Sequence, residues 1–390
     1  MLTTLAISGY RSLRNLVVPL RGLNLITGEN GSGKSNLYRA LRLLAETAQG
    51  NVVQSLAREG GLVSTLWAGP EQIARSVRMG EHAVQGTARK QVVSLRMGFG
   101  SDEYGYLIDL GLPAAPPKVK SMFARDPEIK QEYIWHGERL RPSAMLLERK
   151  GPLVRVRRED GEWEILAQDV ATYDSAIARV ADPRRAPEVL ALRDTVRAWR
   201  FYDHFRADAE APARAPQIGT FTPVLGHDGR DLAAAIQTIE EVGEREALAE
   251  AVDDAFPRSR VWVEIVDGRF AVKMEQHGLL RALDAAELSD GTLRFLLWVA
   301  ALLTPRPPAL MVLNEPETSL HPDLLPALGR LLRKAAERSQ VIVVSHARAL
   351  VEELERSAEC GRIRLEKSFG ETRVVVEEGS EAARWHWPGR

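Results

Sequence analysis

The sequence contains almost no cysteine, since Cys360 is the single one among 390 residues. A lone cysteine cannot form a disulfide within its own chain, and it cannot supply the cysteine pairs of a structural zinc site. A disulfide-linked scaffold and a cysteine-built zinc module are therefore both excluded within one chain.

Long apolar runs are also absent. The longest lies around residues 295–303, far short of the roughly 20 residues that span a bilayer. The N-terminal segment, Met1 to Asn15, lacks the apolar core of a secretory signal peptide. We therefore expect a soluble, cytoplasmic protein that has no membrane partner.

A strong net charge is missing as well. The chain carries a formal net charge of −1, with 45% hydrophobic and 27% charged residues. This is ordinary globular composition, and the length suffices for one large domain with insertions or for two domains. No overall basic field marks a nucleic-acid binder, so any contact with DNA has to come from local patches.

What the sequence does contain is a glycine-rich segment near its N-terminus. Residues 28–35 read Gly-Glu-Asn-Gly-Ser-Gly-Lys-Ser, which fits the phosphate-loop pattern G-x-x-x-x-G-K-[ST]. Residues 23–27 before it have the composition of a strand, and apolar residues recur at helical spacing from Leu37 to Leu44 after it. Strand, loop and helix in this order are the context that a phosphate loop requires.

The residue types in this loop suit a triphosphate. Glycines allow backbone N–H groups to curl around phosphates, and the start of the following helix adds its positive end. Lys34 is expected to reach the β- and γ-phosphates, and Ser35 to ligate Mg2+. The segment is therefore predicted to bind a nucleoside triphosphate with Mg2+ through Gly28, Asn30, Gly31, Ser32, Gly33, Lys34, Ser35 and Asn36.

Apolar patterning predicts the other elements of an α/β fold. Strands are expected at residues 2–8, 92–97, 104–110, 143–148, 153–156 and 163–166, mostly as antiparallel hairpins. Helices are expected at 170–205 and 230–255, followed by a hairpin of residues 260–266 and 269–274. A helix at 293–300, buried parallel strands at 309–313 and 341–344, and a helix at 324–338 complete the prediction.

Polar residues follow both buried strands near the C-terminus. Asn314 and Glu315 come directly after the first strand, and His346 comes after the second. A carboxylate at the end of such a strand can polarise the water that attacks a γ-phosphate, so Glu315 is the predicted general base. His346 is predicted to contact the γ-phosphate.

A fourth motif, Leu-Ser-Asp-Gly-Thr at residues 288–292, precedes a predicted helix. Ser289 is a suitable helix cap, and together with Gly291 it makes a second helix start that can bind an anion. Taken alone, the motif is equally well read as a capped helix. The order in which all four motifs occur favours the functional interpretation.

The four motifs in this order resemble those of ABC-type ATPases in the RecF/SMC/OLD-like branch. The matching segments are residues 28–36 for the Walker A loop, 288–292 for the signature, 309–315 for Walker B, 317–322 for the D-loop and 344–346 for the switch histidine. Residues 7–13 resemble the N-terminal strand and turn of that branch, in which the arginine, here Arg11, faces the nucleotide. The chain resembles a stand-alone head without a coiled coil or a nuclease domain.

The resemblance implies a fold and an assembly. The fold is an α/β P-loop NTPase head of the ABC type, with a mixed or parallel central sheet, an antiparallel β subdomain and an inserted helical lobe. Residues 1–50 and 281–390 would form the two parts of the head, and residues 51–280 the inserted β subdomain and lobe. Two heads would sandwich two ATP molecules in a homodimer, with Ser289 and Gly291 of one copy contacting the γ-phosphate bound by the other.

The resemblance also assigns chemical roles. Lys34, Glu315 and His346 would be catalytic, and Ser35 and Asn314 would hold Mg2+. The family usually has aspartate where this chain has Asn314. Asparagine keeps an oxygen acceptor but loses the charge that helps to hold the metal ion. We therefore expect ATP binding to survive and the hydrolysis of ATP to ADP and phosphate to be slow.

Two functions remain open. The first is an ATP-gated dimeric clamp on DNA that serves repair or defence against foreign DNA. Basic clusters at residues 139–141, 149–150, 155–158 and 184–185 are its candidate DNA contacts, although interspersed acidic residues also fit an ordinary mixed-charge surface. The second is an ATP-dependent scaffold or regulator of a partner effector, a nuclease or toxin, which Asn314 and the near-zero net charge favour.

Overall fold

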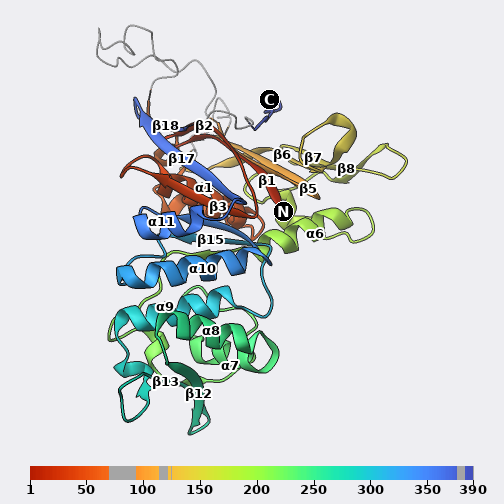
Figure 1. Cartoon of the computed structure of the whole chain (residues 1–390). Coiled ribbons are helices and arrows are strands. Elements are labelled where there is room, and N and C mark those ends of the chain that lie inside the picture. Colours follow the sequence, from red (N-terminus) through yellow and green to blue (C-terminus); the bar gives the residue numbers. More distant parts are fainter. Residues whose placement is uncertain (70–93, 114–121, 124, 376–382, 390) are drawn as a thin grey trace, which may run out of the picture. The chain divides into compact units, whose positions relative to one another are not determined.

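The computed structural model describes residues 1–69, 94–113, 122–123, 125–375 and 383–389 (Figure 1). Helices and strands are both abundant, which confirms the expected α/β class. The chain forms two compact units. The first comprises Met1–Arg21, Thr27–Ala198 and Ile363–Arg390, and the second comprises Gly22–Ile26 and Trp199–Arg362. Within the described part of the chain, every helix is too short or too polar to span a bilayer.

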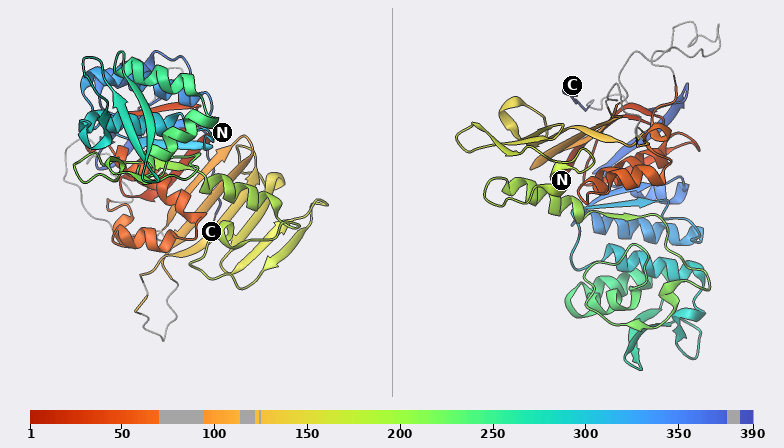
Figure 2. Two further views of the ribbon diagram at one scale, coloured as in Figure 1. Left: turned by 90° about the horizontal axis from the view of Figure 1, so that it is seen from below. Right: turned by 180° about the vertical axis from the view of Figure 1, so that it is seen from behind.

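A long antiparallel sheet dominates the first unit. Its strands follow the order β2-β1-β4-β5-β6-β7-β8-β9, and Figure 2 shows them side by side. The bounds are β1 (Leu2–Tyr10), β2 (Leu13–Pro19), β4 (Leu95–Ser101), β5 (Tyr104–Gly111), β6 (Glu128–His136), β7 (Met145–Lys150), β8 (Leu153–Arg157) and β9 (Trp163–Ala167). The predicted hairpins are confirmed, whereas patterning did not predict β2 or β6.

Two predicted strand starts differ from the structure. Val92 and Val93 lie outside the described residues, and the strand to which they were assigned begins at Leu95 as β4. Residues 143 and 144, predicted as strand, instead belong to the 3-10 helix η1 (Pro142–Ala144). Pro142 favours this turn because its fixed φ suits the first position of a helix. β7 therefore begins at Met145.

The helices of the first unit are α1 (Lys34–Thr47), α2 (Val52–Arg58), α3 (Leu62–Thr65), α5 (Ala176–Arg179) and α6 (Pro187–Arg197). Helix α1 confirms the helix predicted after the glycine-rich segment, and its apolar stripe is buried. The helical region predicted at residues 170–205 is confirmed only for α5 and α6, and its end forms the strand β10 (Arg200–Tyr202). Pro183 and Pro187 interrupt it, because proline disfavours a helical residue before it and cannot continue the hydrogen-bond ladder. A hairpin of β17 (Cys360–Ser368) and β18 (Glu371–Val374) follows near the C-terminus.

Parallel strands form the centre of the second unit. They are β10 (Arg200–Tyr202), β15 (Leu310–Asn314), β16 (Gln340–Val344) and the first residues of β3 (Leu23–Gly28), in that order. β15 and β16 are buried almost throughout, as predicted for strands covered on both faces. Asn314 lies opposite Val344, which lies opposite Ile26, so the carboxyl ends of the strands meet at one edge.

Helices and a small sheet complete the second unit. Figure 1 shows layers that follow one another from β15 through α10 and α9 to α7 and α8 and then to the hairpin β12–β13. The bounds are α7 (Leu232–Val242), α8 (Arg245–Ala255), α9 (Asp290–Leu302), α10 (Leu325–Ala336), α11 (Arg348–Glu355), β11 (Gln217–Ile218), β12 (Arg260–Val266), β13 (Arg269–Glu275) and β14 (Leu283–Asp284). Short 3-10 helices are η2 (Pro212–Arg214), η3 (Ala285–Glu287) and η4 (Pro322–Leu324). The other predicted helices and the hairpin are confirmed, with a break between α7 and α8.

A buried ion pair holds several elements of the first unit together. The side chains of Glu132 on β6 and Arg149 on β7 are both fully buried and lie 2.7 Å apart. Glu132 also accepts hydrogen bonds from the Tyr106 hydroxyl at 2.7 Å and from the backbone N–H of Ala176 at 2.7 Å. Arg149 donates to the carbonyl oxygen of Ala171 at 2.8 Å. The pair therefore fixes the segment that connects the sheet to α5.

This segment reaches the end of α1. The hydroxyl of Ser175 donates to the carbonyl oxygen of Thr47 at 2.6 Å, and both residues are fully buried. Burial also raises the pKa of Tyr106 well above its usual range, so its hydroxyl stays a donor to the carboxylate. The helix that starts at the glycine-rich loop is thus held at its far end by the buried pair.

Replacing Arg149 by methionine is expected to lower the free energy of unfolding by about 3–5 kcal/mol, because Glu132 would keep a buried charge without its cationic partner. Urea unfolding followed by circular dichroism measures the loss. The double variant Arg149→Met/Glu132→Gln removes both charges and is expected to recover much of it. A loss below about 1 kcal/mol in the single variant, the size typical of an exposed pair, contradicts the assignment.

Candidate functional site

The glycine-rich loop runs from the end of β3 to the start of α1. Its glycines adopt positive φ angles, 150° at Gly28, 81° at Gly31 and 109° at Gly33, which other residues rarely adopt. Asn30, Gly31 and Ser35 are exposed. Gly33 caps α1 without a side-chain hydrogen bond, so the first N–H groups of this helix have no intrahelical acceptor. The loop therefore presents backbone donors to an anion.

Lys34 is held inside this loop. Its side chain is buried, and Nζ donates to the carbonyl oxygens of Gly28 at 2.7 Å and Glu29 at 3.1 Å. Ser32 is buried too, and its Oγ atom has no hydrogen-bond partner among the described residues. An orphaned hydroxyl and an ammonium group beside exposed N–H groups fit a phosphate chain, which accepts hydrogen bonds from all three.

A chain of hydrogen bonds fixes the shape of the loop. Asn36 Nδ2 donates to Ser12 Oγ at 2.8 Å, Ser12 Oγ lies 2.7 Å from Thr372 Oγ1, and Thr372 Oγ1 donates to the carbonyl oxygen of Ser32 at 2.7 Å. A Cβ atom on Gly33 would lie 2.1 Å from Thr372 Oγ1, so only glycine leaves room for this contact. Sequence reasoning missed Ser12 and Thr372. Ser12 directly follows Arg11, which was predicted. Thr372 lies on β18, where no sequence motif indicates a role.

Arg11 lies at the turn before β2 with a φ angle of 47°. Its Nη2 atom lies 2.8 Å from Glu59 Oε2, and the hydroxyl of Tyr10 donates to the same oxygen at 2.6 Å. Burial, and then the neighbouring carboxylate of Glu59, raise the pKa of Tyr10 above its usual value. The contact with Glu59 was not predicted. That Arg11 faces a nucleotide stays a prediction.

The second unit carries the residues predicted after the buried strands. Asn314 is the last residue of β15, and its Oδ1 atom is buried without a hydrogen-bond partner among the described residues. Glu315 follows with a φ angle of 51° and donates its backbone N–H to Val344 at 2.8 Å. An orphaned amide oxygen fits a Mg2+ ligand or the acceptor of its water shell. The exposed hydroxyl of Ser35, in the first unit, is the other predicted ligand.

Glu317 fixes the turn that carries His346. It is buried, and its Oε1 atom accepts hydrogen bonds from Ser345 Oγ at 2.7 Å and from the backbone N–H groups of His346 at 3.0 Å and Ala347 at 3.2 Å. His346 Nδ1 lies 3.5 Å from Glu317 Oε1 and 3.7 Å from Glu315 Oε1. The structure thus brings Glu315 and His346 together. Sequence reasoning gave Glu317 no role of its own, because its partners lie about one strand and one helix away.

Side chains of helix α9 fix the turn that follows β15. Trp298 Nε1 donates to the carbonyl oxygen of Pro316 at 3.0 Å. Arg294 is almost fully buried and donates to the carbonyl oxygens of Thr318 at 2.6 Å and Phe205 at 3.1 Å. The helix that begins at the Ser-Asp-Gly motif is therefore bonded directly to the turn that carries Glu315 and Glu317.

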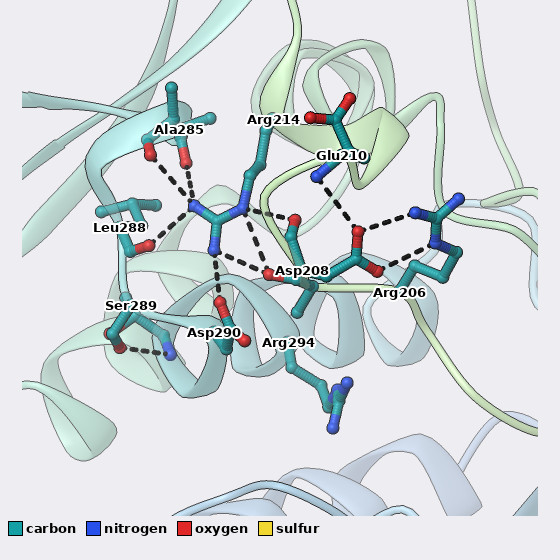
Figure 3. Close-up of polar contacts among 12 residues, drawn as sticks. Arg206, Asp208, Glu210, Arg214, Ala285, Leu288, Ser289, Asp290 and Arg294 are labelled. Carbon is teal, nitrogen blue, oxygen red and sulfur yellow. Dashed lines mark hydrogen bonds and ion pairs between the residues drawn. The ribbon is translucent and has the colours of Figure 1, made fainter.

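The start of α9 is capped as predicted. Ser289 Oγ accepts a hydrogen bond from the backbone N–H of Thr292 at 3.1 Å, and the residue is exposed. Gly291 is half-buried, and a Cβ atom there would meet Ser319 O at an ordinary contact distance. Asp290 pairs with Arg214 at 2.7 Å (Figure 3). Sequence reasoning missed Arg214, which lies on η2, far from the motif in sequence.

Most of the basic clusters are paired within the fold. Arg149 is buried against Glu132, Lys150 and Arg155 pair with Glu148, Arg158 pairs with Asp160, and Arg185 pairs with Asp182 and Glu164. Among the described residues, Arg139, Arg141, Arg157 and Arg184 have no acidic partner, and Arg157 donates to carbonyl oxygens instead. The positive charge available for a phosphate backbone is therefore much smaller than the sequence suggests.

The comparisons with known proteins concern the family and the fold of the chain. A family model described as "AAA domain, putative AbiEii toxin, Type IV TA system" matches residues 23–352. None of the curated protein sequences matched the chain. A solved SMC head bound to the C-winged helix domain of ScpA is 13% identical, with a TM-score of 0.51 over 96% of this chain and 97% of that chain.

Two further SMC heads resemble the chain less closely. The SMC head domain from Thermotoga maritima is 16% identical, with a TM-score of 0.45 over 97% of this chain and 99% of that chain. An Smc head with an extended coiled coil, bound to the C-terminal domain of ScpA derived from Pyrococcus furiosus, is 12% identical, with a TM-score of 0.47 over 96% and 95%. At such identities the likeness to the first head concerns the fold alone. It confirms the predicted P-loop head with a central parallel sheet and an antiparallel β subdomain.

Replacing Thr372 by valine is expected to weaken nucleotide binding about tenfold, equivalent to about 1.4 kcal/mol. The reason is that the Ser32 carbonyl and the Ser12 hydroxyl lose the partner that fixes the loop. Titration with a fluorescent ATP analogue measures the affinity. Thr372→Ser keeps the hydroxyl and is the matched control. If the valine variant binds as tightly as the serine variant, the hydrogen-bond chain does not shape the site.

Proposed function

The chain belongs to this family of AAA domains and has the fold of an ABC/AAA-type ATPase, and from this premise we propose that it binds ATP with Mg2+, dimerises around it and hydrolyses it slowly. We place it in the RecF/SMC/OLD-like branch, with head parts at residues 1–50 and 281–390 and an insertion at 51–280. The observation that carries the proposal is the loop between β3 and α1, whose three positive-φ glycines surround the buried Lys34.

Each residue of the loop has a role in binding. Gly28, Asn30, Gly31, Ser32, Gly33 and Asn36 offer backbone or side-chain donors to the phosphates. Lys34 exchanges its two carbonyl acceptors for the β- and γ-phosphates, and Arg11 faces the nucleotide. Ser35 and Asn314 hold Mg2+, which when bound neutralises phosphate charge. The orphaned oxygen of Asn314 supports this role.

Glu315 and His346 carry the hydrolytic step. Glu315 takes a proton from the attacking water, whose oxygen bonds to the γ-phosphorus while the bond to the ADP oxygen breaks. His346 donates a hydrogen bond to the γ-phosphate. Glu317 supports both residues. It fixes the turn that carries His346, and it follows Glu315 by two residues in the turn after β15.

A homodimer completes the site in this proposal. Ser289 and Gly291 of one copy contact the γ-phosphate held by the loop of the other copy. The exposed position of Ser289 at the start of a 13-residue helix supports it, because such a start attracts anions. A γ-phosphate is the group that distinguishes ATP from ADP, so assembly would follow the nucleotide state.

Glu315→Gln is expected to abolish turnover while ATP and Mg2+ still drive dimerisation, because the variant loses the base but keeps the phosphate loop. Phosphate release measures turnover, and sedimentation velocity measures the oligomeric state. Lys34→Ala is the control, expected to lose both nucleotide binding and dimerisation. If the glutamine variant hydrolyses ATP at the native rate, Glu315 is not the general base.

Asn314→Asp is expected to increase the rate of hydrolysis several-fold, because a carboxylate at the end of β15 holds Mg2+ more tightly than an amide does. The same phosphate-release assay, run across a range of Mg2+ concentrations, measures the rate and the apparent affinity for the ion. Asn314→Ala is the matched control for loss of the oxygen. Equal rates in the native chain and the aspartate variant would contradict the view that Asn314 causes slow turnover.

The target of the ATPase has two candidates. The family resemblance supports an ATP-gated clamp on DNA that acts in repair or in defence against foreign DNA. The internal pairing of most basic residues supports a second candidate, an ATP-dependent scaffold or regulator of an effector protein such as a nuclease or toxin. The toxin–antitoxin wording of the family description agrees with the second candidate.

The ATPase rate with and without duplex DNA separates the two. A clamp is expected to be stimulated strongly at low salt and less at moderate salt, because phosphate contacts release counterions. A scaffold is expected to show no stimulation and to form stable oligomers with ATP. Arg139→Ala/Arg141→Ala removes two clustered cations that lack acidic partners within the described residues, so any stimulation that survives it does not depend on this patch.

A further inference from the structure

Arg214 makes more hydrogen bonds than any neighbouring side chain around the Ser-Asp-Gly motif (Figure 3). It lies at the end of η2, and its side chain is only 9% exposed. Its guanidinium donates to the carbonyl oxygens of Ala285 at 3.0 Å, Ala286 at 3.2 Å, Leu288 at 2.7 Å, Ala207 at 2.7 Å and Asp208 at 2.9 Å, and to Asp290 Oδ1 at 2.7 Å. The two segments that it joins are separated by about seventy residues of chain.

The carbonyl contacts fix the backbone that enters α9. Figure 3 shows the carbonyl groups of Ala285 and Leu288 pointing at the Arg214 guanidinium, whereas Ser289 bonds to its own helix. Carbonyl oxygens are the negative ends of peptide dipoles. Because Arg214 binds these carbonyl oxygens, the hydroxyl and N–H donors of the motif remain available on the exposed side of the turn.

Asp290 presents an electrostatic problem for an anion site. Its carboxylate stands between Ser289 and Gly291 in the first turn of α9, and its side chain is 63% exposed. A carboxylate there competes with a phosphate for the positive end of the helix and repels the phosphate directly. Arg214 cancels this charge, and its hydrogen bonds to five carbonyl oxygens hold the guanidinium in place beside Asp290.

We propose that Arg214 is a positioning residue, which holds the turn at residues 285–291 in the form that receives the γ-phosphate bound by a second copy of this chain and cancels the charge of Asp290 there. The proposal rests on the ATP-dependent dimer proposed above. It predicts a defect confined to assembly, since the hydrogen bonds of Arg214 all lie within the second compact unit, whereas the phosphate loop belongs to the first.

The same loop supplies a matched control. Arg206 forms a two-bond pair with Asp208 at 2.7 and 2.9 Å, and both side chains are 53% exposed. This pair has the same chemistry as the pair of Arg214 with Asp290, but it contacts no atom of the turn. Arg206→Ala is therefore expected to leave assembly within about twofold of the parent, because exposed pairs contribute little.

The experiment measures two affinities in a Glu315→Gln parent, in which ATP is not consumed. Fluorescent ATP titration at low protein concentration reports binding to the monomer, and sedimentation with ATP and Mg2+ reports the dimer. Arg214→Ala is expected to weaken the dimer about thirtyfold or more, because it removes the hydrogen bonds that fix the turn and leaves the charge of Asp290 uncompensated. Monomer ATP affinity is expected to change by less than about twofold, because the hydrogen bonds of Arg214 go to residues 207–208 and 285–290 and none goes to the loop.

The charge of Asp290 is tested by a double variant. Arg214→Ala/Asp290→Asn removes the uncompensated carboxylate and is expected to recover part of the lost dimer affinity, while the carbonyl contacts stay lost. Asp290→Asn alone is expected to dimerise at least as well as the parent. A double variant as weak as Arg214→Ala overturns the charge component, and equal monomer and dimer losses in Arg214→Ala reduce the residue to a merely structural one.

The remaining outcomes are also decisive. If the Glu315→Gln parent stays monomeric with ATP, the proposed dimer is wrong and this inference falls with it. If the parent dimerises and Arg214→Ala dimerises equally, only the inference is wrong. Should Arg214→Ala unfold, as its thermal transition would reveal, Arg214→Lys keeps the charge but not the fork of donors. It is expected to dimerise several-fold more weakly, and parity with the parent overturns the proposal.

Discussion

The parallel register of β15, β16 and the first residues of β3 is the constraint on which the second unit depends. It aligns Asn314, Val344 and Ile26, so the chain leaves three buried strands at one edge. Buried strands leave no room for polar groups, and polar chemistry therefore begins where they end. Asn314, Glu315 and His346 therefore stand at that edge, and a one-residue change in register would move all of them.

A second layer of polar residues turns this edge into a site of defined geometry. Glu317 accepts three hydrogen bonds from the turn after β16, and Arg294 and Trp298 bond the turn after β15. In the first unit, Thr372 does the same for the glycine-rich loop. In each case a buried polar side chain fixes a turn or loop that carries predicted site residues, as preorganised sites require.

Sequence reasoning predicted the residues that act through their own local pattern. The loop at residues 28–35, the strands β15 and β16 and the cap at Ser289 follow from spacing, periodicity and residue type. It missed Thr372, Glu59 and Arg214, because each works through a partner far away in sequence, and no local pattern records such a pair. The same limit explains why only parts of the helical region predicted at 170–205 are helical. Its helical composition was read correctly, but two prolines and the pairing of β10 with β15 decided the structure.

Asn314 and Asp290 bear on the same quantity in the proposed mechanism, the lifetime of an ATP-bound assembly. There Asn314 lowers the negative charge on the metal side and would slow hydrolysis, which would leave bound ATP intact for longer. Asp290 adds a negative charge to the turn that would face the phosphate, and Arg214 cancels it from a nearly dry position. A buried cation is screened little by salt. In the proposed dimer, a turn neutralised in this way would keep its affinity for phosphate throughout a long-lived bound state, which would suit an ATPase whose output is assembly more than turnover.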